Sequence, residues 1–191
     1  MKIGYLIEVD NLKEELNKKT LSSLSGDYKV FTKDNLFDVV KTLEWDNAVI
    51  IPNNSELNEN FEEIISVYVK EDSIMLPLTV LKLDNTSGVL NTCVWNSSLT
   101  GKIGNLDHEL SLKQIDLTLY GALIPLKYLV EENFNKEVKY YGHFYFFNKV
   151  TKQEVPVIGV PKTLLTIEKD LFYTSITTDE KMKYFNMAKE I

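Results

Sequence analysis

Residues 49–56 read VIIPNNSE, in which three apolar residues lead into Pro52, two asparagines, a serine and Glu56. A short apolar run bounded by turn-forming residues is typical of a buried strand. The carboxyl ends of parallel strands are where α/β sheets bind their ligands, and a divalent metal ion held there needs carboxylate oxygens. This strand ends in two neutral amides where a metal-dependent enzyme would need carboxylates. The role of these amides therefore bears on whether the chain is expected to be an enzyme.

The segments before this strand alternate between strand and helix patterns. Apolar runs predict strands over residues 2–9, 28–34 and 47–52, and apolar residues at helical spacing predict helices over 11–25 and 35–44. A β-α-β-α-β order implies parallel strands joined by right-handed crossovers. The sequence therefore predicts the α/β class.

The second half of the chain predicts shorter elements, without a linker or an internal repeat. In order, we expect a helix over 56–70, short strands within 72–100, a strand or turn at 120–122 leading into a helix, mixed helix and strand over 138–150, a closing strand over 155–167 and a C-terminal helix over about 178–190. The 191 residues are accordingly expected to form one domain, residues 1–191.

The charge and composition exclude several classes of function. The net charge is −7, and all 21 basic residues are lysine. Arginine supplies the planar donor fork that grips phosphate and guanine, so its absence argues against sequence-specific nucleic-acid binding. Cys93 is the only cysteine, so no disulfide within the chain is possible. No apolar run approaches the length of a membrane span, and we expect the protein in the cytoplasm.

Five segments stand in an order that resembles a known family. They are KIGYLIEVDN (2–11), LNKKTLSSLSG (16–26), YKVFTKDN (28–35), AVIIPNNSELNENFEE (48–63) and IDLTLYGALIPLKYLVEENFN (115–135). Together they resemble the family-2-type nucleotide-sugar glycosyltransferases of the A-type fold. The resemblance implies a single-domain, three-layer α/β fold with a mainly parallel central sheet. It also places a vestigial nucleotide-sugar site at Asn11, Asp34, Asn35, Asn53, Asn54 and Glu56.

The two asparagines are the first departure from the family pattern. The resemblance implies an Asp-x-Asp pair at this place, which binds a divalent metal that neutralises the diphosphate leaving group. In this chain Pro52, Asn53 and Asn54 match that position, and Glu56 is the nearest carboxylate. An amide oxygen is a weaker ligand for a hard cation. We therefore expect neither a metal ion nor another cofactor.

The catalytic base is the second departure. Inverting members of the family place an acidic pair near the start of a late helix, where one carboxylate deprotonates the acceptor hydroxyl. The matching stretch, VKYYGHFYFF, offers Gly142 and His143 instead. A third departure is the short segment between Asp34 and the strand at 47–52, because the family inserts a longer nucleotide-binding segment there.

The densest group of aromatic residues lies between residues 140 and 147. No single face of a helix or strand can bury six such neighbours, so part of the group is expected on the surface. Exposed tyrosine and phenylalanine favour contact with another protein. The candidate interaction residues are Tyr140, Tyr141, Phe144, Tyr145 and Phe147.

Three hypotheses follow from these patterns. We favour a non-catalytic structural or assembly protein on a degenerate glycosyltransferase-like fold, with other protein chains as partners. A bacteriophage virion, assembled in the host cytoplasm, is its most concrete setting. The first alternative is an active sugar transferase that uses Asp34 for the nucleotide, Glu56 or Asp84 in support, and His143 or Asp116 as the base. The second alternative is a protein that binds a nucleotide sugar without turning it over.

Overall fold

The computed structural model describes residues 1–69, 72–83, 86–90, 93–94, 102–103, 118–135 and 142–168. Its strands are β1 (Ile3–Glu8), β2 (Tyr28–Phe31), β3 (Asn47–Pro52), β4 (Ser55–Leu57), β5 (Ile74–Leu83), β6 (Thr86–Leu90), β7 (Cys93–Val94), β8 (Lys102–Ile103), β9 (Leu123–Pro125) and β10 (Val157–Glu168). Its helices are α1 (Lys18–Ser22), α2 (Leu36–Val40), α3 (Phe61–Tyr68) and α4 (Gly142–Lys152), with the short 3-10 helices η2 (Leu126–Tyr128) and η3 (Glu131–Asn133).

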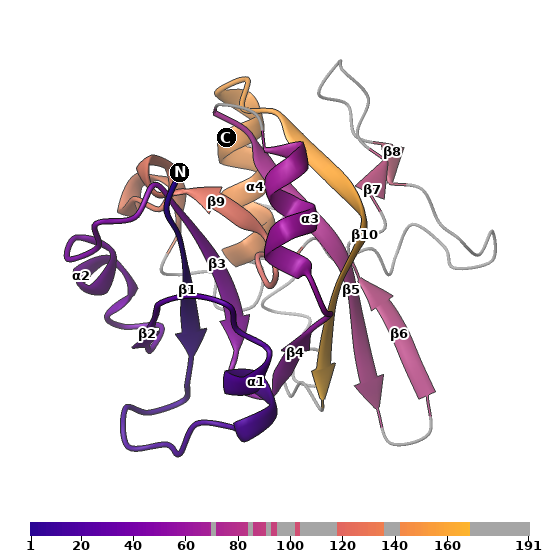
Figure 1. Ribbon diagram of the computed structural model, residues 1–191. Coiled ribbons are helices and arrows are strands. Elements are labelled where there is room, and N and C mark those ends of the chain that lie inside the picture. The colour runs from indigo at the N-terminus through magenta and orange to yellow at the C-terminus, as the bar shows by residue number, and fades with distance from the viewer. Residues whose placement is uncertain are drawn as a thin grey trace.

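The main sheet has eight strands in the order β2-β1-β3-β9-β5-β10-β4, with β6 paired to β5. β1 is parallel to β2 and β3, and β10 is parallel to β5. Because β9 runs antiparallel to both β3 and β5, the strands β1, β2, β3, β5 and β10 all point the same way. The expected α/β fold with a mainly parallel central sheet is confirmed (Figure 1).

Helices cover both faces of this sheet (Figure 1). Successive side chains of a strand point to opposite faces. Tyr5 of β1 points to the face that carries α3, where its hydroxyl donates to Glu62 at 3.0 Å. Glu8, three residues later, points to the other face, where its partner Tyr120 packs against His143 of α4. The sheet is therefore the middle of three layers.

The core is centred on β1 and β3. The first five residues of each strand are buried, as expected for parallel strands covered on both faces. Gly4 provides the room that the Trp45 ring needs, because a Cβ atom at this glycine would lie 2.2 Å from that ring. A larger residue at position 4 of β1 would therefore collide with the Trp45 ring.

Two predicted helices are shorter than expected. Of residues 11–25, only Lys18–Ser22 is helical, because the preceding loop is hydrogen-bonded to Asn53 at the end of β3. The helix expected over 56–70 begins at Phe61, since Ser55–Leu57 pairs with β10. In both cases a contact with a distant strand overrides the local helical pattern.

Other expectations are corrected or lie outside the described residues. The helix expected over 35–44 ends at Val40, and the helix expected after residue 122 is replaced by β9 and two 3-10 helices. Within 142–152 the chain is helical, where a mixture of helix and strand was predicted. The helix expected over about 178–190 lies outside the described part of the chain.

Candidate functional site

The side chain of Asn53 forms hydrogen bonds with other residues of the protein through both its nitrogen and its oxygen. Its side-chain nitrogen donates to the Glu14 carboxylate at 2.7 Å and to the Glu15 carbonyl at 3.0 Å, and its side-chain oxygen accepts from the Asn17 amide at 2.8 Å. The residue is only 8% exposed. A carboxylate accepts but does not donate, so aspartate cannot make two of these three bonds. Asn53 therefore holds the loop before α1 against the end of β3.

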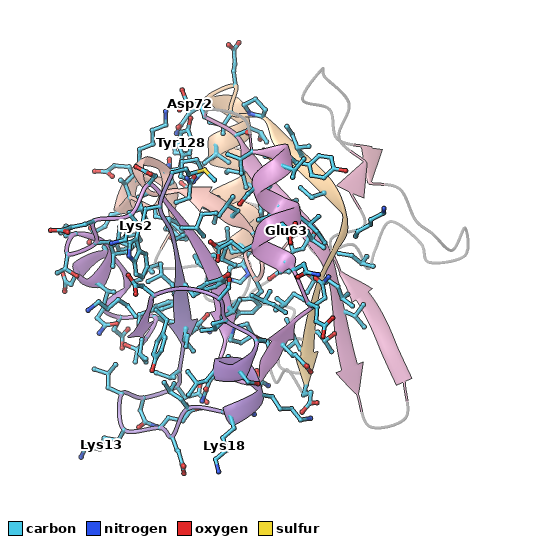
Figure 2. All side chains as sticks on the ribbon, in the orientation of Figure 1. Lys2, Lys13, Lys18, Glu63, Asp72 and Tyr128 are labelled. Carbon is cyan, nitrogen blue, oxygen red and sulfur yellow. The ribbon has the colours of Figure 1, made fainter. Side chains whose placement is uncertain are left out.

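Asn54 is engaged at the other side of the same turn. Its side-chain nitrogen donates to the main-chain carbonyl of Glu168, and its own carbonyl accepts from the Glu168 amide at 2.8 Å. The buried Thr20 hydroxyl lies 2.8 Å from the Asn53 carbonyl and 2.7 Å from the Ser55 carbonyl. The paired amides thus join α1, the end of β3 and the end of β10. Lys13 and Lys18, near this junction, point outward (Figure 2).

The structure places the residues of the expected nucleotide-sugar site in several different surroundings. Asn11 is exposed and accepts from the Lys13 amide at 3.1 Å, and Asn35 accepts from the Thr32 amide at 2.7 Å in the turn before α2. Glu56 lines a cavity of about 630 Å³ beside α1 and α3. Asp34 lines a different cavity, on the face that carries α4.

We call this second hollow the strand-end cavity, because it lies where β1 and β2 end. Its volume is about 500 Å³, within the range of small-ligand sites. Its walls include four apolar residues that are buried in the protein, namely Phe31, Leu36, Ile50 and Leu119. Its charged side chains are Glu8, Lys33, Asp34, Asp38 and Glu131. The cavity therefore combines an apolar floor with a charged rim.

Glu8 was missed by the sequence analysis, although it is the one charged residue in an otherwise apolar strand. Its side chain is 11% exposed and accepts a hydrogen bond from the Tyr120 hydroxyl at 2.8 Å. The Lys33 ammonium lies 3.9 Å from its other oxygen. A carboxylate this deeply placed needs such partners, and it is part of the site because it lines the cavity.

His143 enters the same cavity from the start of α4. Its Nδ1 atom accepts from the Leu119 amide at 3.3 Å and lies 3.1 Å from the Thr118 hydroxyl, which assigns the ring proton to Nε2. Burial, with a smaller contribution from the Lys33 cation, lowers the pKa of His143 to about 3. The ring is therefore neutral at pH 7 and weakly basic, which suits a hydrogen-bond donor better than a general base.

The aromatic residues expected on the surface divide into three cases. Phe147 is 2% exposed and packs edge-on against Phe146, so its assignment to an interaction surface is wrong. Tyr145 is half-buried. The predictions for Tyr140, Tyr141 and the side chain of Phe144 lie outside the described part of the chain.

The described part of the chain contains neither a metal-binding cluster nor a membrane-spanning helix. Across the described ranges, no group of three or more histidine, cysteine, aspartate or glutamate residues is placed to hold a metal ion. No helix in that part of the chain is long and apolar enough to cross a membrane.

The comparisons with known proteins rest on structure alone. The sequence matches no protein-family profile and no curated protein sequence. The structure is similar to that of TarS 1-349 from S. aureus in complex with UDP-GlcNAc, with a TM-score of 0.57 and 11% identity, over 93% of this chain and 62% of that one. The fold is glycosyltransferase A-like.

A second solved structure with this fold is the viral protein A197 from STIV. It has a TM-score of 0.53 and 10% identity to this chain, and the match covers 89% of this chain and 87% of that one. Identities this low show a common fold and carry no function across. The likeness to glycosyltransferases that the sequence pattern implied is confirmed at the level of the fold.

Proposed function

We propose that this protein is a non-catalytic assembly protein built on a glycosyltransferase A-like fold. The observation that carries the proposal is the engagement of Asn53 and Asn54 with loop and strand backbone at the end of β3. At the matching place an active metal-dependent enzyme needs free carboxylates to bind the ion that neutralises diphosphate. Here the same position fastens the protein's own elements together.

The likeness to A197 from STIV supports a viral setting for this role. The structural match covers 89% of this chain and 87% of that one. We therefore propose that the protein is a virion component, associated with the neck, tail or capsid of a bacteriophage and assembled in the host cytoplasm. Its partners in this proposal are other protein chains.

The second candidate function is binding of a nucleotide sugar without turnover. The place of the strand-end cavity in the fold favours it, because ligands of open α/β sheets bind where the strands end, and Asp34 lines this cavity; the charge of its lining does not. The likeness to TarS in complex with UDP-GlcNAc points the same way.

The active transferase has less support. Glu56 lies beside a different cavity, and His143 is weakly basic. Asp84 and Asp116, which were considered as an assisting carboxylate and a base, lie outside the described residues.

One set of assays separates the three functions. We would measure thermal unfolding with UDP-, GDP- and CDP-sugars, with and without Mn²⁺, and release of free nucleoside diphosphate over hours. A ligand that binds only the native state raises the melting temperature. The assembly proposal expects no Mn²⁺-dependent shift and no release, and it expects the protein in purified particles at a fixed copy number. Release above a heat-denatured control would contradict it, whereas a shift without release would favour the second candidate.

A further inference from the structure

The rim of the strand-end cavity is predominantly negative. Four carboxylates, from Glu8, Asp34, Asp38 and Glu131, face one ammonium, from Lys33. The Lys33 ammonium lies 3.9 Å from the Glu8 carboxylate. The ammonium of Lys41, which does not line the cavity, lies 4.0 Å from the Asp38 carboxylate. With His143 neutral, the lining carries more negative than positive charge at pH 7.

The floor of the cavity is apolar and partly aromatic. Phe31 and Leu119 are each 2% exposed. The rings of Phe37 and Phe134 meet edge to face at 5.2 Å, and both also line the cavity. A ligand that fills this space gains by burying hydrocarbon on the floor and placing a polar or charged group at the rim.

This combination disfavours a phosphate group and favours a cation. Like charges repel, and the cavity offers a single lysine and no arginine against a ligand that carries two or more negative charges. A guanidinium on a hydrocarbon stem fits both parts. Its planar fork donates to carboxylates, it stacks on aromatic rings, and its methylene groups pack on apolar surface.

We propose that the strand-end cavity receives an arginine side chain of a partner protein. This inference rests on the proposed assembly function. The chain contains no arginine, so a second copy of this protein does not supply the side chain. Its net charge of −7 complements a basic partner and accelerates their encounter.

The test uses a matched pair of small probes on the full chain. N-acetyl-arginine amide and N-acetyl-citrulline amide have nearly the same shape, and only the first is charged. We would titrate each at low salt and follow the protein by NMR. We expect saturable, millimolar binding of the arginine probe, since one side chain buries little surface. We expect at least tenfold weaker binding of the citrulline probe, and weaker arginine binding as salt is raised.

Variants locate the binding within the molecule. Asp34→Asn and Glu131→Gln each remove one exposed charge from the rim and should weaken the arginine probe severalfold. Glu63→Gln is the matched control, because Glu63 lies on α3 beside the other cavity (Figure 2). It should leave binding unchanged.

Three results would overturn the inference: equal affinity for the two probes, no binding of the arginine probe, or tighter binding of uridine diphosphate than of the arginine probe. These outcomes are separate from failure of the proposed function. Nucleoside diphosphate release from a sugar donor would overturn the non-catalytic assignment, whatever the arginine probe does.

Discussion

Two regions at the same edge of the sheet use their polar residues in opposite ways. At the end of β3, the side chains of Asn53 and Asn54 form hydrogen bonds with the loop before α1 and with β10, respectively. At the ends of β1 and β2, Glu8, Asp34 and His143 line a cavity of about 500 Å³. The first region is a joint between elements, and the second lines a cavity.

The difference shows that neighbouring strand ends of one sheet can hold their polar residues in different ways. Amides at the end of β3 serve as donors and acceptors at once, which makes them good joints and poor metal ligands. The carboxylates of the strand-end cavity only accept hydrogen bonds, so they cannot link carbonyl groups in this way. Each region can therefore be altered separately.

The largest effect on stability is expected from Asn53→Asp. This variant tests whether the end of β3 is a structural joint or a ligand site. The change removes two donated hydrogen bonds and places a carboxylate beside Glu14. We expect a loss of about 3 kcal/mol in the free energy of unfolding, measured with urea. The exposed Asn11→Asp is the control. Full stability together with new Mn²⁺ binding would contradict our interpretation.

A pH series tests the cavity through His143. The histidine pKa is about 3 in the folded protein and near 6.5 when unfolded. Below pH 6.5 the unfolded chain takes up a proton that the folded chain does not, so stability is present above 6.5 and is lost progressively towards pH 3. The loss from this residue is about 2 kcal/mol at pH 5.

The matched variant for this series is His143→Asn, whose side-chain oxygen can still accept from the Leu119 amide. Urea unfolding of both proteins at several pH values isolates the histidine, because the carboxylates are common to both. Parallel stability curves for the two proteins would show that the pKa of His143 is the same in the folded and the unfolded chain.

A smaller effect is expected from Tyr120→Phe. The change removes the hydroxyl that donates to Glu8 at 2.8 Å and keeps the buried ring. We expect a loss of about 1 kcal/mol in unfolding free energy. Tyr28→Phe, at a 43% exposed position on β2, should change little. An equal loss in both variants would mean that the Glu8 contact adds nothing.

The smallest effect on stability is expected from Lys19→Ala. This variant tests whether the exposed ion pair or the amide hydrogen bonds hold the joint together. Lys19 forms an exposed ion pair with Glu168 at 2.8 Å, in which the hydrogen bond raises the lysine pKa. Exposed pairs contribute little, so thermal unfolding should be unchanged within error, at low and at high salt. Asn54→Ala should be clearly less stable. A larger loss of stability in Lys19→Ala than in Asn54→Ala would mean that the ion pair holds the joint together more than the amide hydrogen bonds do.

The sequence predicted the central strands well because their pattern is local. β1 and β3 are continuous apolar runs, and the fold class follows from how such runs alternate with helical segments. The loop before α1 was predicted as helix because Leu12, Leu16 and Leu21 have nearly helical spacing. Its true state depends on the bond from the Asn17 amide to Asn53, which lies 36 residues away.

The site was predicted only in part for the same reason. Asp34 and His143 were named separately, and the structure brings them to one cavity. Asn53 and Asn54 were expected to be remnants of a ligand site, but their partners include Glu168, which lies 114 residues from Asn54. A periodic pattern holds no information about such distant contacts, whereas the lone charge of Glu8 was visible and was overlooked.

The position of β10 has a consequence for the order in which the protein can fold during synthesis. β10 lies between β5 and β4, and it is the strand to which β4 is paired. Leu164 of β10 follows Asn58 by 106 residues. At about 5–20 residues per second, β4 therefore waits roughly 5–20 s at the ribosome for its neighbour. During that interval β1, β2 and β3 can already pair, so the joint at Asn54 is among the last parts of the molecule to close.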